Sequence, residues 1–167
     1  MWARLESNTI KETLRRPKAL TIGGAQYPSN IFSRWSDAEL AVIGIVPITM
    51  DYTNQKDLKY YINTEVTYTY DAETKKATGS YGTATARPLT GLKSQHKIEI
   101  NLQAGSLLQP TDWMVIREAD GGTSIPSNIK TFRTAVRTKA NTHCTSIDNV
   151  ASVDALAALT FDWPEQP

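Results

Sequence analysis

The sequence changes from strand-like to helix-like once, near Pro88, and this order constrains the fold more than any other feature. Residues 60–88 place Val66, Tyr68 and Tyr70 at alternate positions, which is typical of a strand with one sheltered face. Beyond Pro88, apolar residues recur at helical intervals instead. Strands followed by helices predict an α+β protein, with a small N-terminal antiparallel β-rich part and a C-terminal helical hairpin.

Changes of pattern divide the chain into three expected segments. Residues 1–17 are an N-terminal arm or helix, residues 18–88 the β-rich part and residues 89–167 the helical part. Apolar residues of the first segment recur at roughly helical spacing, and an extended arm laid on a partner fits as well. A chain of 167 residues is long enough for one compact domain, or for a small domain with an appendage.

Local signals place shorter elements within the β-rich part. Ser36 followed by Glu39 predicts a capping box at the start of a short helix, and Gly44 is placed to end it. Residues 19–22 are expected to form a short strand, followed by a turn over residues 23–30.

The helical part is expected to contain two longer helices and a short final one. The first covers residues 92–108, and the second begins after Pro126. Gly121 and Gly122 stop the helical pattern between them, and Ser152 caps the final helix. The expected apolar positions of the first helix are Ile98, Leu102, Leu107 and Leu108. Those of the second are Ile129, Phe132, Val136 and Ala140, with Lys130, Arg133, Arg137 and Lys139 on the opposite face.

Residues 109–120, QPTDWMVIREAD, combine acids, a base and an aromatic residue. The hypothesis of general acid–base catalysis by Asp112, Glu118 and Asp120 competes with a structural joint between helices. We favour the joint: Pro110 interrupts one helix, Thr111 or Asp112 caps the next, and the Trp113 ring is buried where the helices meet.

Composition narrows the possible functions. Lys and Arg together number 18 and Asp and Glu 17, so no strong field is available to hold nucleic acid or an anionic membrane. No stretch approaches the roughly 18 apolar residues of a membrane helix, and no signal peptide is evident. We therefore expect synthesis and action in a cytoplasm, and virions that are assembled there fit as well.

Metal, cofactor and catalytic sites are not expected. Cys144 is the single cysteine, which excludes an internal disulfide and multi-thiolate metal sites. His96 and His143 lie far apart in sequence, so a shared metal would require a tertiary coincidence. His143 and Cys144 point about 100° apart on a helix and do not form a catalytic pair, which leaves them as surface or helix-end residues.

Aromatic and apolar side chains are the candidates for binding. Tyr68, Tyr70 and Tyr81 on the strands, with Phe132 and Val136 on the second long helix, are predicted to contact a protein partner. The alternative is a carbohydrate-binding or hydrolytic module that uses surface tyrosines and carboxylates.

Three stretches are similar to one known family. Residues 107–137 contain TDW, then an arginine and an acid, then IP and a helix with an FR..VR pair. This order resembles the C-terminal region of tail-fibre assembly proteins and related tail proteins of tailed bacteriophages. Residues 27–48 and 152–167 resemble the N-terminal block and the ending of the same proteins.

The resemblance implies a non-enzymatic protein that binds phage tail-fibre or baseplate proteins. It implies either a virion component of the tail or an assembly chaperone in the host cytoplasm, and a homo-oligomer is possible. No catalytic residue is carried over from the family, and TDW is carried over only as a structural joint.

Overall fold

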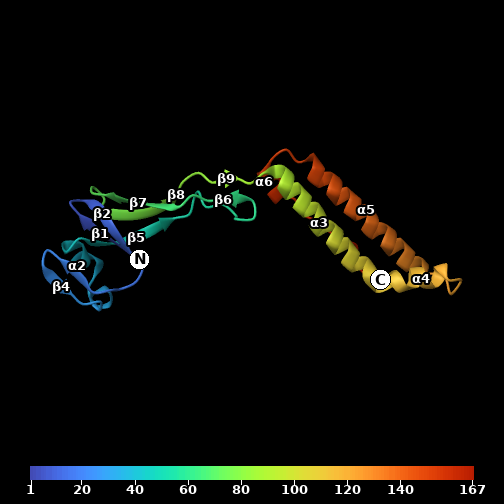
Figure 1. The fold of residues 1–167 in the computed structure, drawn as a ribbon, viewed down its shortest axis with the longest axis horizontal. Helices are drawn as coiled ribbons and strands as arrows, with labels where there is room; N and C mark the ends of the chain where they lie inside the picture. The colour runs from blue at the N-terminus through green and yellow to red at the C-terminus, as the bar shows by residue number, and fades with distance from the viewer. The chain divides into compact units, whose positions relative to one another are not determined.

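The computed structural model describes residues 1–167 and divides them into two compact units, Met1–Thr85 and Ala86–Pro167 (Figure 1). The first unit is rich in strands, and the second is helical, which confirms the predicted α+β class. The boundary falls close to the predicted change at Pro88. None of the helices has the length and apolar character needed to cross a membrane.

The main sheet of the first unit contains five strands in the order β2-β1-β5-β8-β7. Its strands are β1 (Trp2–Glu6), β2 (Thr9–Leu14), β5 (Ile45–Asp51), β7 (Val66–Asp71) and β8 (Lys76–Tyr81). All neighbours are antiparallel, as expected of this part of the chain, except β5 and β8, which run parallel and make the sheet mixed. Residues 52–65, which separate β5 from β7, are long enough to carry the chain past β8 to the sheet edge.

Residues 2–14 form a β-hairpin, so the prediction of an arm or helix over residues 1–17 is wrong. The turn at Ser7 and Asn8 has positive φ at both positions, 49° and 61°, as a tight hairpin turn requires. Trp2 pairs with Leu14 and packs with it into one apolar cluster, whereas Leu5 pairs with Ile10 and packs into another. Both faces of the hairpin are therefore covered, and a register shift after Arg4 further obscures the alternation that marks a strand.

Two apolar clusters lie on opposite faces of the sheet. One contains Leu14, Leu20, Ile31, Leu40 and Ile45, and the other contains Ala3, Val46 and Ala77. The first cluster includes residues of β3 (Leu20–Ile22), α1 (Ile31–Arg34) and α2 (Asp37–Val42). Consecutive Ile45 and Val46 are both buried because β5 is covered on both sides.

The predicted helix signals in this region are confirmed. Ser36 Oγ accepts a hydrogen bond from the Glu39 amide at 3.3 Å, and Glu39 Oε2 accepts one from the Ser36 amide at 2.7 Å. Gly44 follows the end of α2 with φ of +77°, and its carbonyl accepts a bond from the Leu5 amide at 2.7 Å. A Cβ at Gly44 would lie 3.0 Å from the Leu5 carbonyl oxygen, so glycine is required both by conformation and by space.

The chain also contains two smaller strand pairs. The predicted turn over residues 23–30 is shorter than expected, because Ala25–Tyr27 forms strand β4 and pairs with β3 across Gly23 and Gly24. Strands β6 (Tyr61–Ile62) and β9 (Thr85–Ala86) form a separate two-stranded sheet. The β7–β8 hairpin is present as predicted.

The helical unit contains the predicted hairpin of long helices. Its elements are α3 (Leu89–Leu108), the 3₁₀ turn η1 (Gln109–Thr111), α4 (Asp112–Ala119), α5 (Ser127–Asn149) and α6 (Val153–Ala157). Helices α3 and α5 pack against each other along the unit (Figure 1). The predicted cap of the final helix is confirmed, since Ser152 Oγ accepts a bond from the Ala155 amide at 3.1 Å.

The predicted apolar face of α3 is wrong. The residues that face α5 recur every four positions and are Leu92, His96, Ile100 and Ala104. Ile98 and Leu102 are instead 60% and 68% exposed. The predicted stripe of α5 is correct at Phe132, Val136 and Ala140, but Arg133 is buried beside it rather than exposed.

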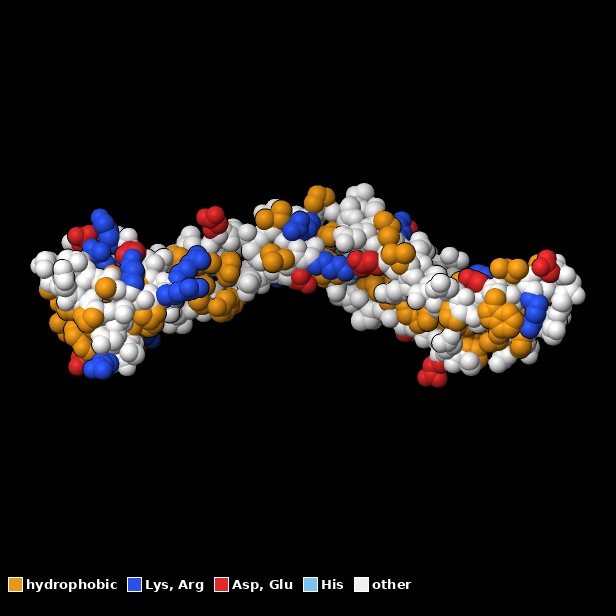
Figure 2. Space-filling view, turned by 60° about the horizontal axis from the view of Figure 1, so that its bottom comes forward, with side chains coloured by type: hydrophobic (Ala, Val, Ile, Leu, Met, Phe, Trp, Pro, Cys, Tyr) orange, Lys and Arg blue, Asp and Glu red, His pale blue; other side chains and the backbone are white.

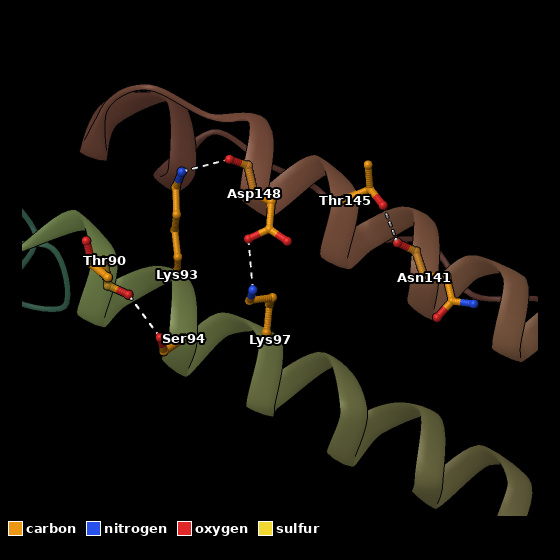
Figure 3. A network of polar contacts seen from close by, with 7 residues as sticks. All are labelled: Thr90, Lys93, Ser94, Lys97, Asn141, Thr145 and Asp148. Carbon is orange, nitrogen blue, oxygen red and sulfur yellow. Dashed lines mark hydrogen bonds and ion pairs between the residues drawn. The ribbon is translucent and has the colours of Figure 1, made fainter.

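Lysines of α3 tie the open end of the hairpin to the last turn of α5 (Figure 3). Lys93 Nζ donates to the Asp148 carbonyl at 2.8 Å, and Lys97 Nζ pairs with an Asp148 carboxylate oxygen at 2.8 Å. The bond to Asp148 raises the pKa of Lys97. Cations at a helix C-terminus also complement its dipole, so both contacts favour the observed alignment of the helices.

Candidate protein interface

Helix α4 is the most exposed apolar element of the helical unit. None of its residues is buried, and Trp113 and Ile116 are 53% and 65% exposed. Figure 2 shows hydrophobic side chains at the surface of the end of the helical unit that carries α4. The prediction that the Trp113 ring is buried between helices is therefore wrong. The ring instead lies against Arg117, whose guanidinium carbon is 4.8 Å from the ring centre.

The joint itself is built around Arg133 of α5. Its Nη1 donates to the Leu108 carbonyl at 2.9 Å and to Thr111 Oγ1 at 2.5 Å, and its Nη2 pairs with Asp112 Oδ1 at 2.7 Å. Thr111 Oγ1 also donates to the Leu108 carbonyl at 2.9 Å. A guanidinium suits this position because its donors are fixed in one plane and reach several acceptors at once. Arg133 therefore fixes the end of α3 and the start of α4 relative to α5.

This arrangement corrects the roles predicted for the joint residues. Pro110 lies in the 3₁₀ turn between α3 and α4, as expected of a residue that interrupts a helix. Asp112 does not cap α4, since its carboxylate accepts from Arg133, and Thr111 at the N-cap makes no side-chain capping bond. The buried residue of the TDW motif is Thr111 and not Trp113.

The far end of α4 is held by a glycine pair and two side chains. Gly121 has φ of +80°, and the Gly122 amide donates to the Arg117 carbonyl at 2.9 Å, which closes the helix as predicted. Glu118 pairs with Lys130 of α5 at 2.8 Å, and this hydrogen bond lowers the pKa of Glu118. Contacts at both ends therefore hold α4 in one orientation.

Two of the three acids of this region are held in ion pairs. Asp112 and Glu118 are each engaged by a base of α5, Arg133 and Lys130 respectively. Asp120 occupies the C-terminal cap position of α4. These acids belong to the helical unit, whereas the tyrosines of the alternative hypothesis belong to the strand-rich unit.

The C-terminal tail covers both histidines. His143 lies edge-on to Phe161 and Trp163, with ring centres 5.1 and 5.2 Å away, and His96 lies 6.4 Å from Phe161. His143 Nε2 contacts the Asp162 carbonyl at 2.8 Å. Both histidines are buried, so the prediction that His143 is a surface or helix-end residue is wrong.

Polar contacts hold the same tail on both long helices. Trp163 Nε1 donates to Gln103 Oε1 at 3.0 Å, and Lys139 Nζ pairs with Asp162 Oδ2 at 2.6 Å. The hydrogen bond from Lys139 lowers the pKa of Asp162. No group of three His, Cys, Asp or Glu side chains comes together in a way that would hold a metal ion. The histidines therefore serve as the surface on which the tail packs.

The residues predicted to contact a partner have different environments. Phe132 and Val136 are buried in the α3–α5 core, so their assignment to a surface is wrong. Tyr68, Tyr70 and Tyr81 are half-buried on their strands. Tyr70 packs against the cluster of Ala3, Val46 and Ala77 and also lines an open groove of about 610 Å³ with Val42 and Lys75.

The comparisons with known proteins found no similarity. The chain matches no protein-family model, and neither a curated protein nor a solved structure matches it.

Proposed function

We propose that this chain is a tail protein of a tailed bacteriophage that acts by binding another tail protein through α4. The order of the TDW, IP and FR..VR elements, which resembles tail-fibre assembly proteins, supports the phage assignment. The observation that carries the binding role is the exposure of Trp113 and Ile116 on a helix held at both ends.

The physical chemistry of α4 suits a binding surface. Trp and Arg are the residues that most often dominate binding energy at protein interfaces, and Trp113 and Arg117 are stacked together here. A helix already fixed by Arg133 and Lys130 loses little conformational freedom when a partner binds. The expected partner surface is an apolar pocket with a polar rim that accepts the indole ring.

Binding by α4 is tested with tail-fibre and baseplate proteins of the same phage. Purified full chain is immobilised, and each candidate partner is passed over it at moderate salt. The double variant Trp113→Ser and Ile116→Ser is expected to lose binding while its far-UV circular dichroism stays unchanged, because both side chains are exposed. Val42→Ser, which alters an exposed apolar residue of the strand-rich unit, is the matched control and is expected to bind normally. Equal binding by all three chains contradicts the assignment of α4.

The place of action is decided by mass spectrometry of purified virions. Stoichiometric presence of the chain supports a virion component of the tail. Its absence from virions, together with binding to fibre subunits in infected cells, supports an assembly chaperone.

A further inference from the structure

Helix α3 carries a second apolar stripe that faces away from α5. Its apolar side chains are those of Ile98 and Leu102, and the same line along the helix continues through Gly91, Gln95 and Gly105 to Gln109 of the following 3₁₀ turn. All six residues are exposed. At 100° per residue, its centre lies roughly opposite the buried stripe of Leu92, His96, Ile100 and Ala104. We call it the outer stripe. A helix with apolar residues on two opposite faces is expected to pack against something on both.

The outer stripe of α3 contains no charged residue. None of the exposed residues of α3 is charged, because Lys93, Lys97 and Glu99 are all partly buried and both lysines reach across to α5. By contrast, the exposed face of α5 includes Lys130 and Arg137. Depletion of charge at the centre of a patch distinguishes interface cores from the remaining protein surface.

The two glycines of the outer stripe have no explanation within the chain. A Cβ added at Gly91 or at Gly105 would meet no atom of this protein within 4 Å, and neither glycine has a positive φ. A glycine inside a helix costs about 1 kcal/mol relative to alanine. Glycine on a helix surface does allow another backbone to approach closely. The outer stripe is therefore shaped for close contact with a second helix.

We propose that the outer stripe binds the outer stripe of a second copy of this chain, with the two α3 helices antiparallel. A two-fold axis level with Ile100 places Ile98 opposite Leu102 of the other copy. The same axis places Gly105 opposite Gln95 and Gly91 opposite Gln109, so that each glycine faces a long side chain. The sequence is thus complementary to itself in the antiparallel register, as a two-fold interface requires.

The dimer is expected to be of moderate strength. Helix α3 has 20 residues and is about 30 Å long, which places a helix-to-helix contact at the small end of specific interfaces. We therefore expect a dissociation constant in roughly the micromolar range. This inference does not depend on the proposed function, since α4 is not part of the outer stripe.

Sedimentation velocity of the full chain from roughly 1 to 100 µM tests the dimer. The chain is expected to shift from monomer to dimer as its concentration rises. The double variant Ile98→Glu and Leu102→Glu is expected to remain a monomer. The control Thr138→Glu, on the exposed face of α5, is expected to dimerise normally. Mixing the acidic double variant with Ile98→Lys and Leu102→Lys is expected to restore a mixed dimer. A monomer at every concentration, or a dimer insensitive to the acidic variant, overturns the proposal.

Cysteine cross-linking in a Cys144→Ser background tests the register. A chain with Ile98→Cys is expected to form disulfides more readily with a chain that carries Leu102→Cys than with a second chain that carries Ile98→Cys. Preferential disulfides between two Ile98→Cys chains overturn the antiparallel arrangement. Gly105→Ala is expected to raise the helicity of the monomer but to weaken the dimer about tenfold, because the added methyl group obstructs the facing Gln95. An unchanged dimer also overturns this register.

Discussion

Replacement of Arg133 by methionine tests whether this residue holds the helical joint together. The Arg133 side chain is 7% exposed and bonds to Leu108, Thr111 and Asp112. Methionine fills much of the same volume but donates no hydrogen bond. The substitution therefore removes the polar contacts while leaving most of the packing in place.

The size of the loss in stability depends on whether each hydrogen-bond partner of Arg133 finds another donor after the guanidinium is removed. Removing one member of a fully buried ion pair costs about 3–5 kcal/mol. Here the Asp112 side chain is 54% exposed, so water replaces the lost bond at that end. The Leu108 carbonyl also keeps its bond from the Thr111 hydroxyl. We therefore expect Arg133→Met to lower the unfolding free energy of the helical unit by about 2–3 kcal/mol.

Urea denaturation followed by circular dichroism at 222 nm measures this change, because the helical unit dominates the signal at that wavelength. Arg137→Met is the matched control: it lies one turn further along α5, is exposed and has no bonded partner. We expect its effect to stay within about 0.5 kcal/mol. Equal midpoints for the two variants would refute the view that Arg133 organises the joint.

Two further predictions concern the strand-rich unit and the tail. Gly44→Ala is expected to lower the unfolding free energy of the strand-rich unit by about 1–3 kcal/mol. Gly24→Ala is expected to lower it by less, because the added methyl group meets open space. Tryptophan fluorescence during thermal unfolding compares the two variants. The hydrogen bond from Lys139 lowers the pKa of Asp162 in the folded chain. The contribution of Asp162 to holding the tail in place is therefore present above the ordinary pKa of aspartate and is lost as the pH falls through the lowered pKa. Fluorescence of Trp163 during acid titration is expected to report loosening of the tail at low pH, and Asp162→Asn to remove this dependence. A titration curve identical in both chains contradicts the second prediction.

The fold of the strand-rich unit was predictable where signals are local. The capping box of Ser36 and Glu39 and the helix-ending Gly44 depend on a few neighbouring residues, and all are found as predicted. The first hairpin was not predictable in the same way. Its residues are covered on both faces and carry a register shift, so Trp2, Leu5, Ile10 and Leu14 follow neither strand nor helix spacing clearly.

The joint was predicted at the correct place but with the wrong residues inside it. Size and apolar character favour burial of Trp113 over Thr111 when only the sequence is considered. In the structure, Arg133 lies 22 positions away from Thr111 in sequence and creates a polar site that accepts a small hydroxyl. The basic residues of α5 cannot be told apart from their spacing, and only the packing against α3 shows which one is buried.

Which face of α3 is buried could not be predicted from the sequence either, and the observed choice leaves Ile98 and Leu102 exposed. The sequence contains two stripes with helical spacing, and the larger exposed residues Ile98 and Leu102 belong to the one that does not face α5. The stripe that is buried contains Leu92, Ile100 and Ala104, and the contacts of Lys93 and Lys97 with Asp148 lie beside it. These partly exposed contacts add to the packing but are too weak to select the buried face by themselves. The same contacts draw both lysines toward α5. The outer stripe around Ile98 and Leu102 therefore carries no charge, and it faces away from α5, available to another helix.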